Sequence, residues 1–360
     1  MGYAIIAGIW GALLALVGFC AVAFVVFADL KEPTRSVRTA GTRLENVASV
    51  IYGRNFTPMW QSNPSCVEFD RELLYVPKPG TARFAGPEFD TVITMTMDGL
   101  RRQPDAPTAG ERGPILMVGD SFTMGWGVND AQTFSALLAR DYRHPTVNTG
   151  VPSYGTAREL LRLRRLGLLT RASALVIQYC ANDAPENREF LLHDGALYAD
   201  RDPERQWREL QRYGQAELSY FRVLGAWMRN IREHGFAPDR GLLQGVLPGE
   251  PNRQRLRYPG GGATMAGDFL AVLERFPELA GKRILVFELN AYGEESEFLS
   301  HLKTQAAQRK NLRTLQLTLG RADFFRYDWH LTPAGHRSVA AQLDRALRDD
   351  HEMEGPATAR

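Results

Sequence analysis

The sequence predicts a three-layer α/β domain with a parallel sheet, preceded by a membrane-spanning helix. Two observations predict the domain: short apolar segments alternate with segments of helical periodicity, and a chain of 360 residues can bury a sizeable core. A third predicts the helix, because residues 5–27 form an apolar run without a charged side chain.

The N-terminal run is long enough to cross a bilayer, since a helix over residues 5–27 would measure roughly 34 Å. A cleaved signal peptide is the alternative. Its apolar core is usually about 7–15 residues long and follows a basic start, whereas Met1-Gly2-Tyr3 carries no basic side chain. These features favour a retained single-span anchor over residues 1–30.

The overall charge gives no support to a nucleic-acid partner, because 43 basic and 41 acidic side chains leave a formal charge of only +2. Of the three cysteines, Cys20 lies in the apolar run, so only Cys66 and Cys180 could pair, and their free and disulfide forms both stay open. The sequence has no CxxC spacing that would favour a zinc site, and no metal or organic cofactor is expected.

Residues 31–113 are expected to form a linker and a small β-containing lead-in. The prolines and glycine of residues 73–80 predict a loop, and the Val, Ile and Thr content of residues 91–97 predicts a strand. This lead-in could be a separate unit or could simply cap one edge of the main sheet.

The main domain is expected over residues 114–350, followed by a tail at 351–360. Continuous apolar runs are typical of strands buried on both faces. Strands are predicted at residues 115–118, 146–148, 174–179, 283–289 and 312–317, and helices at 133–142, 158–169 and 334–348.

A helical insertion is expected at about residues 186–280, between the third and fourth strands. Apolar side chains recur at helical spacing through residues 203–234, which favours one long amphipathic helix lying on the domain. The alternative is a lid, for which the glycine-rich residues 258–262 would supply a hinge.

Polar residues with catalytic chemistry follow the predicted strands. The first strand leads directly into Gly119-Asp120-Ser121, and Asn182 follows the third strand, so both are expected at the carboxyl edge of the sheet, where ligands bind. Near the C-terminus, His330 could take the serine proton, and Asp328 could orient its imidazole.

The order G-D-S-F, a glycine-bearing loop, x-N-D and D-x-H-L-T-P-x-G-H resembles the GDSL/SGNH hydrolase family over residues 114–348. The resemblance implies a flavodoxin-like α/β/α fold with Ser121 as nucleophile, His330 as general base and then acid, and Asp328 as its orienter. It also implies an oxyanion hole formed by the Ser121 backbone N–H, a loop N–H and the Asn182 side chain.

Two positions depart from the family pattern. Many members carry Asp three residues before the histidine, where this chain has Tyr327; Asp328 stands two residues before it. In the loop after Asn148, Ser153 replaces the family's glycine. Because the donor is a backbone N–H, Ser153 can serve if the loop permits it, and Gly150 or Gly155 could replace it after a shift.

The expected reaction is acyl transfer through an acyl-serine, with water or a sugar hydroxyl as acceptor. The anchor and the resemblance favour O-acyl groups, above all O-acetyl, on an envelope or secreted polysaccharide. The alternatives are a non-catalytic sugar-binding or scaffolding component of a membrane polysaccharide-assembly complex, and a lipid-directed lipase or thioesterase.

The side of the membrane is predicted by two conflicting arguments. Basic residues after the span (Lys31, Arg35, Arg38 and Arg43) would place the domain in the cytoplasm by the positive-inside tendency. The resemblance implies work outside the cytoplasm, and the extracytoplasmic, periplasmic side is favoured.

Overall fold

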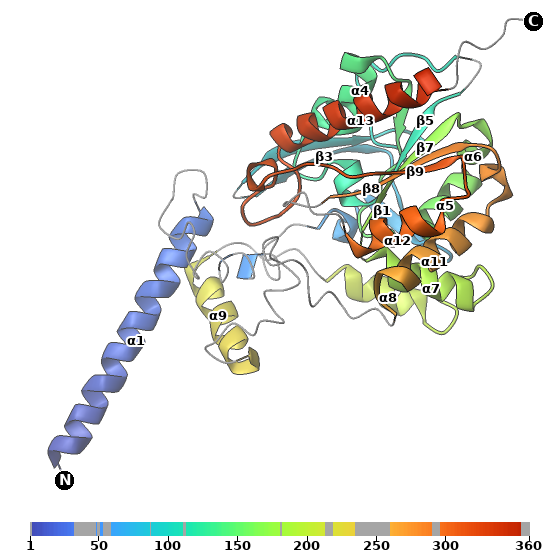
Figure 1. Cartoon of the computed structure of the whole chain (residues 1–360). Helices are drawn as coiled ribbons and strands as arrows, with labels where there is room; N and C mark the ends of the chain where they lie inside the picture. The colour runs from blue at the N-terminus through green and yellow to red at the C-terminus, as the bar shows by residue number, and fades with distance from the viewer. Residues whose placement is uncertain are drawn as a thin grey trace, which may run out of the picture.

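The computed structural model describes residues 2–31, 48, 51–52, 59–86, 88–110, 113–180, 182–212, 219–234, 260–289 and 296–353. Its centre is a five-stranded parallel sheet in the order β6-β5-β7-β8-β9 (Figure 1). The strands are β5 (Ile115–Val118), β6 (Thr146–Asn148), β7 (Ala174–Tyr179), β8 (Arg283–Glu288) and β9 (Leu312–Leu315). The predicted parallel sheet is therefore confirmed, with strands close to the expected ranges.

Helices cover both faces of this sheet, because alternate side chains of each strand point to opposite sides. Ile115 and Met117 of β5 pack with α4 and α13, whereas Leu116 and Val118 pack with the helices of the other layer. The helices of the first layer are α4 (Phe134–Tyr142) and α13 (Pro333–Met353). Those of the second are α5 (Thr156–Arg165), α6 (Leu168–Arg171), α7 (Asp183–Leu192), α11 (Gly261–Glu274) and α12 (Glu297–Gln305).

Two predicted helix boundaries have a visible cause. The helix expected at residues 158–169 is divided into α5 and α6 because Gly167 adopts a left-handed φ of 64° between them. The start of α13 is fixed by Thr332, whose hydroxyl accepts a hydrogen bond from the N–H of Gly335 at 3.1 Å. Short 3₁₀ turns complete the domain at Trp60–Ser62, Asp130–Gln132, Pro277–Leu279 and Arg321–Asp323.

The lead-in consists of two antiparallel hairpins, β1 (Val67–Asp70) with β2 (Leu74–Pro77) and β3 (Gly80–Ala85) with β4 (Asp90–Met95). The predicted loop at residues 73–80 is thus wrong in its first half. Pro77 is tolerated because it ends a strand of a two-stranded sheet. An isolated bridge between Arg101 and Asn148 of β6 joins the lead-in to the edge of the main sheet.

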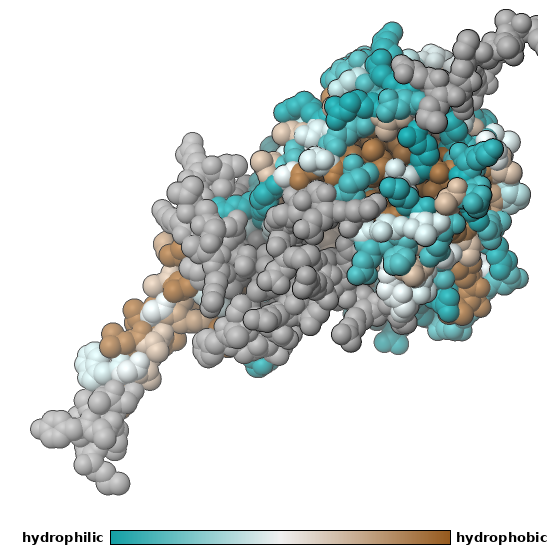
Figure 2. All heavy atoms as spheres, viewed as in Figure 1, coloured by the Kyte–Doolittle hydropathy of each residue, from teal (hydrophilic) through white to brown (hydrophobic). Residues whose placement is uncertain are grey.

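The N-terminal helix α1 (Gly2–Lys31) projects away from the domain and carries apolar side chains over most of its length (Figures 1 and 2). Its segment Ile9–Lys31 has a mean hydropathy of 2.6 in its most apolar window, of which only 11% is buried. This length and composition fit a membrane span, and a signal sequence would meet the same criteria.

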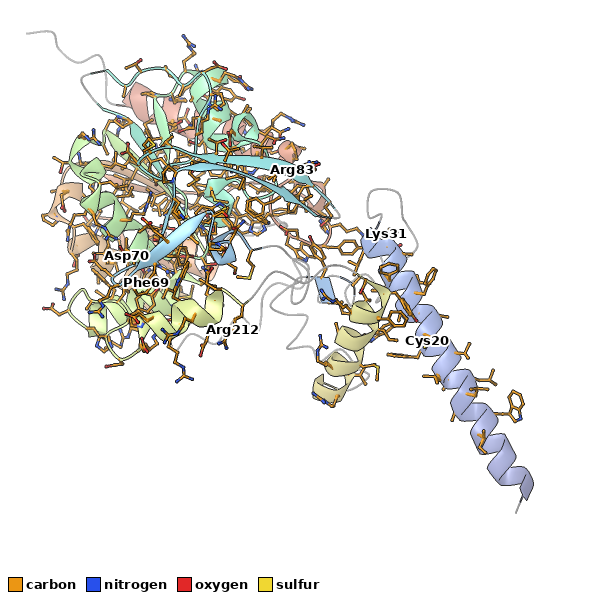
Figure 3. The ribbon with its side chains drawn as sticks, turned by 180° about the vertical axis from the view of Figure 1, so that it is seen from behind. Cys20, Lys31, Phe69, Asp70, Arg83 and Arg212 are labelled. Atoms are coloured by element: carbon orange, nitrogen blue, oxygen red, sulfur yellow. The ribbon has the colours of Figure 1, made fainter. Side chains whose placement is uncertain are left out.

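The insertion does not form one long helix on the domain, so that prediction is wrong. It forms α8 (Pro203–Leu210) and α9 (Tyr220–His234), separated by residues outside the described part of the chain. Trp207 of α8 packs on the lead-in, 6.3 Å from the ring of Phe69, which Figure 3 labels on β1. The apolar side of α9 instead packs against α1. Two of the five residues of the glycine-rich segment proposed as a hinge, residues 258–259, lie outside the described residues.

All three cysteines, Cys20, Cys66 and Cys180, are free, so the disulfide considered for the last two is absent. Cys180 is half-buried, and its thiol contacts the carboxyl group of Asp120. Its position after β7 explains this contact, since β7 pairs in parallel with β5, which leads into Asp120.

Candidate active site

Ser121 stands at the sharp turn between β5 and the short helix α3 (Ser121–Met124). The buried carboxylate of Asp120 caps this helix by accepting a hydrogen bond from the N–H of Phe122 at 2.9 Å. Burial raises the pKa of Asp120, while the Phe122 N–H and the neighbouring His330 oppose the rise. The aspartate of the GDS sequence therefore shapes the turn that presents the serine.

The structure brings Ser121, His330 and Asp328 into one hydrogen-bonded chain. Ser121 Oγ lies 2.7 Å from His330 Nε2, and His330 Nδ1 lies 2.5 Å from Asp328 Oδ1. The short spacing between the aspartate and the histidine is accommodated by Trp329, which stands between them with a left-handed φ of 68°. This is the geometry of an activated serine nucleophile.

The charge of Asp328 controls the basicity of His330. Burial alone would lower the pKa of His330, but the buried Asp328 carboxylate and its hydrogen bond outweigh this effect and raise it above the ordinary value of 6.5. Phe122 covers one face of the imidazole, with ring centroids 4.6 Å apart. At neutral pH the pair can take and return a proton.

Trp126 holds the second oxygen of Asp328. Its indole N–H donates to Asp328 Oδ2 at 3.2 Å, so both carboxylate oxygens have a partner. Trp126 is itself 4% exposed and is packed edge-on by Phe84 and Phe89 of the lead-in, with centroid distances of 5.0 and 5.6 Å. It is both a core residue and a positioning residue for the aspartate.

The loop that carries Asp328 is held by a carboxylate of the lead-in. Glu88, between β3 and β4, accepts hydrogen bonds from the backbone N–H groups of Arg326, Tyr327 and Asp328 at 2.5, 2.7 and 2.8 Å. Burial raises the pKa of Glu88, and the three N–H donors oppose this rise by favouring its ionised form. Nothing in the sequence around Glu88 indicates this role.

The loop after β6 lies against the nucleophile turn. A Cβ at Gly150 would lie 2.3 Å from the backbone nitrogen of Met124, so only glycine fits there. Asn148 joins the two segments, donating to the carbonyl of Thr123 at 2.7 Å and accepting from the N–H of Gly150 at 3.1 Å. The N–H of Val151 continues the contact by donating to the carbonyl of Gly119.

Ser153, which replaces the family's glycine, adopts the left-handed conformation that glycine favours, with a φ of 60°. Its neighbours hold it there: Gln61 donates to its hydroxyl at 2.9 Å, and Arg158 donates to its carbonyl at 2.5 Å. Tyr75 also donates to the carbonyl of Pro152. The serine is therefore accommodated through contacts with the lead-in and α5, without a shift to Gly155 or Gly150.

Ser153 and Asn182 are exposed and line one pocket of about 320 Å³. The walls come from the lead-in and the α5, α7 and α8 region and carry both polar and apolar side chains. The polar ones include Gln61, Arg158, Glu186, Glu189, Arg201 and Gln206, and the apolar ones are Met59, Leu74, Pro185 and Leu210, beside Tyr75 and Tyr198. A second hollow, lined by Leu273, Phe276 and Leu312, lies near the amino ends of β8 and β9, at the opposite edge of the sheet.

Two other polar residues of the motifs have structural roles. His336 is buried, and its Nδ1 accepts the N–H of Phe134 at 3.0 Å, which joins α13 to α4. Burial lowers the pKa of His336 to about 3, so it stays neutral. Asp183 is buried beside Thr156, whose hydroxyl donates to it at 2.7 Å.

No protein-family model matches the chain, and no curated protein matches it in sequence. Among solved structures, a lipase/acylhydrolase from Enterococcus faecalis has 14% identity and a TM-score of 0.36, covering 66% of this chain and 96% of its own. A GDSL-like lipase from Bacteroides thetaiotaomicron has 10% identity and a TM-score of 0.35, covering 69% and 92%. An acetyl xylan esterase from Butyrivibrio proteoclasticus has 13% identity and a TM-score of 0.37, covering 68% and 66%. Because these TM-scores are low, we interpret the site from its own geometry.

The chain resembles the GDSL/SGNH hydrolases in its fold and in the order of its motifs. Each motif lies where that family's pattern predicts it. Ser121 follows β5, the loop of Ser153 follows β6, Asn182 follows β7, and Asp328 and His330 precede the C-terminal helix α13. Three residues, Trp126, Glu88 and Gln61, support these motifs through tertiary contacts that the sequence did not predict.

We expect activity to rise with pH through a midpoint above 6.5, because protonated His330 cannot accept the serine proton and its pKa is raised. Asp328→Asn removes the anion, so the midpoint should fall and kcat should drop roughly 10,000-fold. Rates of ester hydrolysis between pH 5 and 9 measure both effects. If Asp328→Asn does not change the midpoint of the rise in rate with pH, a group other than His330 is titrating.

We expect Trp126→Phe to lower kcat about 10- to 100-fold with little change in KM, because a hydrogen bond to a charged group contributes about 1.5–3 kcal/mol. Trp207→Phe, which removes an indole from α8, is the matched control. If both variants lower kcat equally, the Trp126 N–H has no special role in orienting Asp328.

Proposed function

We propose that this chain is an ester hydrolase or O-acyltransferase that forms an acyl-serine at Ser121. The single observation that carries the proposal is the continuous chain Ser121–His330–Asp328, with contacts of 2.7 and 2.5 Å. An accidental serine–histidine contact would not need both oxygens of a buried carboxylate to be held, as Asp328 is here.

The reaction follows from these contacts. Ser121 Oγ attacks the ester carbonyl as its proton passes to His330 Nε2, and Asp328 stabilises the imidazolium. The backbone N–H groups of Ser121 and Ser153 and the Asn182 side chain are the proposed donors to the oxyanion. His330 then protonates the departing alcohol, and water or a sugar hydroxyl, deprotonated by His330, releases the acyl group and regenerates the serine.

The mixed lining of the pocket supports a carbohydrate ester as substrate. Ionised pairs and amides stand there beside two tyrosines and four apolar side chains, a combination that suits both the hydroxyls and the apolar ring faces of a sugar. Arg158 pairs with Glu186 at 2.6 Å, and Arg201 pairs with Glu189, so both charges are balanced before a neutral sugar binds. We propose O-acyl groups, above all O-acetyl, of an envelope or secreted polysaccharide as substrate.

We further propose that α1 is a retained membrane anchor and that the domain works on the extracytoplasmic side, as a polysaccharide substrate requires. A second candidate function is a non-catalytic sugar-binding component of a membrane polysaccharide-assembly complex. The pocket alone would serve such a role equally well. The supported triad favours catalysis, since sugar binding does not need it.

We expect the full-length chain in detergent to be labelled at Ser121 by a fluorophosphonate, with loss of fluoride as the serine oxygen bonds to phosphorus. Labelling should vanish in Ser121→Ala and slow by at least 100-fold in His330→Ala. Ser135→Ala, at a buried serine of α4, is the matched control and should label normally. A folded chain that does not label would favour the sugar-binding role.

We expect Gln206→Ala to raise KM about three- to tenfold for an acetylated oligosaccharide, because one hydrogen bond contributes about 0.5–1.5 kcal/mol. Gln206 lines the pocket, and its Oε1 has no hydrogen-bond partner within the described part of the chain. Hydrolysis of 4-nitrophenyl acetate, which is too small to fill the pocket, should not change. An unchanged KM for the oligosaccharide would place the sugar elsewhere.

The same assay separates hydrolysis from transfer. With an unacetylated oligosaccharide added as acceptor, a transferase forms acetylated sugar and a hydrolase forms only acetate. Acetyl groups found on water alone would remove the transferase alternative and leave the esterase.

A further inference from the structure

Helix α9 carries two large apolar side chains that are exposed on one face. Phe221 and Met228 are 80% and 57% exposed and lie seven residues apart, which places them on one side of the helix. Arg222 and Arg229, also exposed, form a parallel row beside them. An apolar row bordered by arginines is typical of a helix lying in a membrane interface.

The opposite face of α9 packs along the second half of α1. Trp227 lies 5.0 Å from the ring of Phe19, and Tyr220 lies 6.0 Å from Phe24. The Tyr220 hydroxyl also donates to the carbonyl of Cys20 at 3.1 Å, and Figure 3 labels Cys20 at this level of α1, beside α9. Both helices therefore share one apolar interface and have a fixed relation to each other.

The surface of α1 changes character at this level. From Ile9 to Val17 its large apolar side chains are 48–68% exposed and Phe24 is 55% exposed, whereas Val26 and Leu30 are fully buried by protein. In Figure 2 the apolar colour follows the protruding part of α1 toward the domain. The contact with α9 falls at the transition, where a spanning helix leaves the lipid.

We propose that α9 lies in the headgroup region of the membrane that α1 spans, with Phe221 and Met228 among the acyl chains and Arg222 and Arg229 at the lipid phosphates. The exposed apolar surface of α1 continues onto α9 through Phe24 and Tyr220, and the arginines complement the anionic phosphates. This inference rests on the proposed anchor and adds a second, interfacial contact to it.

The consequence concerns the active site. Val223 and Ala226 of α9 are buried in the same cluster as Val26, Leu30 and Tyr327, and Tyr327 immediately precedes Asp328. Arg326 Nη2 also lies 3.8 Å from the buried Asp29 of α1. The helix pair therefore sets the Asp328–His330 loop at the membrane surface, within reach of substrate that emerges from or is attached to the bilayer.

Spin labels on the full-length chain test the proposal in vesicles of phosphatidylglycerol and phosphatidylethanolamine. Labels at Phe221→Cys and Met228→Cys are compared with Leu14→Cys on α1 and Arg205→Cys on α8, in a Cys20→Ala background. Leu14 is 68% exposed, and the side chain of Arg205 is 75% exposed. Power saturation measures collision with apolar oxygen and with a water-soluble nickel chelate.

We expect positions 221 and 228 to resemble position 14 in favouring oxygen over nickel at least threefold, and position 205 to favour nickel. Nickel access at 221 and 228 with oxygen access at 14 would refute the interfacial helix and leave the anchor intact. Nickel access at position 14 would refute the anchor and the inference together. Dipolar broadening at 221 and 228 without oxygen access would show that a second copy covers this face, which also overturns the proposal.

Discussion

Three backbone N–H groups near the end of the chain need an acceptor, and Glu88 supplies it. Buried backbone donors are rarely left unpaired, and a carboxylate that accepts three of them fixes the path of the chain around it. Because the path runs through Asp328, the same bonds fix where His330 meets Ser121. The position of the catalytic loop thus depends on a lead-in hairpin that precedes the main domain in sequence.

The lead-in supplies other parts of the site as well. Gln61 and Tyr75 donate hydrogen bonds to the loop that contains Ser153. The rings of Phe84 and Phe89 pack against Trp126, whose indole N–H donates to Asp328. A left-handed serine costs roughly 1–2 kcal/mol relative to glycine, and bonds from Gln61 and Arg158 offset a cost of that size. Without residues 59–101 the loop of Ser153 and the Asp328 carboxylate would lose these contacts.

Local patterns predicted the elements that depend on few neighbours. The strands β5 and β7 could be recognised because burial on both faces requires a continuous run of apolar residues. Glu88 meets its partners across about 240 positions and Trp126 meets Asp328 across 202, so neither contact has a local signature. Amphipathicity likewise predicted that α9 buries one face, but it could not indicate that α1 covers it.

The contact between α1 and the catalytic loop changes what counts as the functional unit. A helix that served only as a flexible tether would be joined to the domain by a solvent-exposed linker. Here the α1 residues Val26, Asp29 and Leu30 are fully buried, and Val26 and Leu30 pack in one cluster with Tyr327. Loss of Val26 and Leu30 would expose the apolar side chain of Tyr327, and loss of Asp29 would remove the carboxylate that lies near Arg326. Tyr327 and Arg326 are one and two residues from Asp328. The candidate active site therefore extends structurally to α1: the sheet leads into Ser121, while the histidine loop lies between the lead-in and the base of α1.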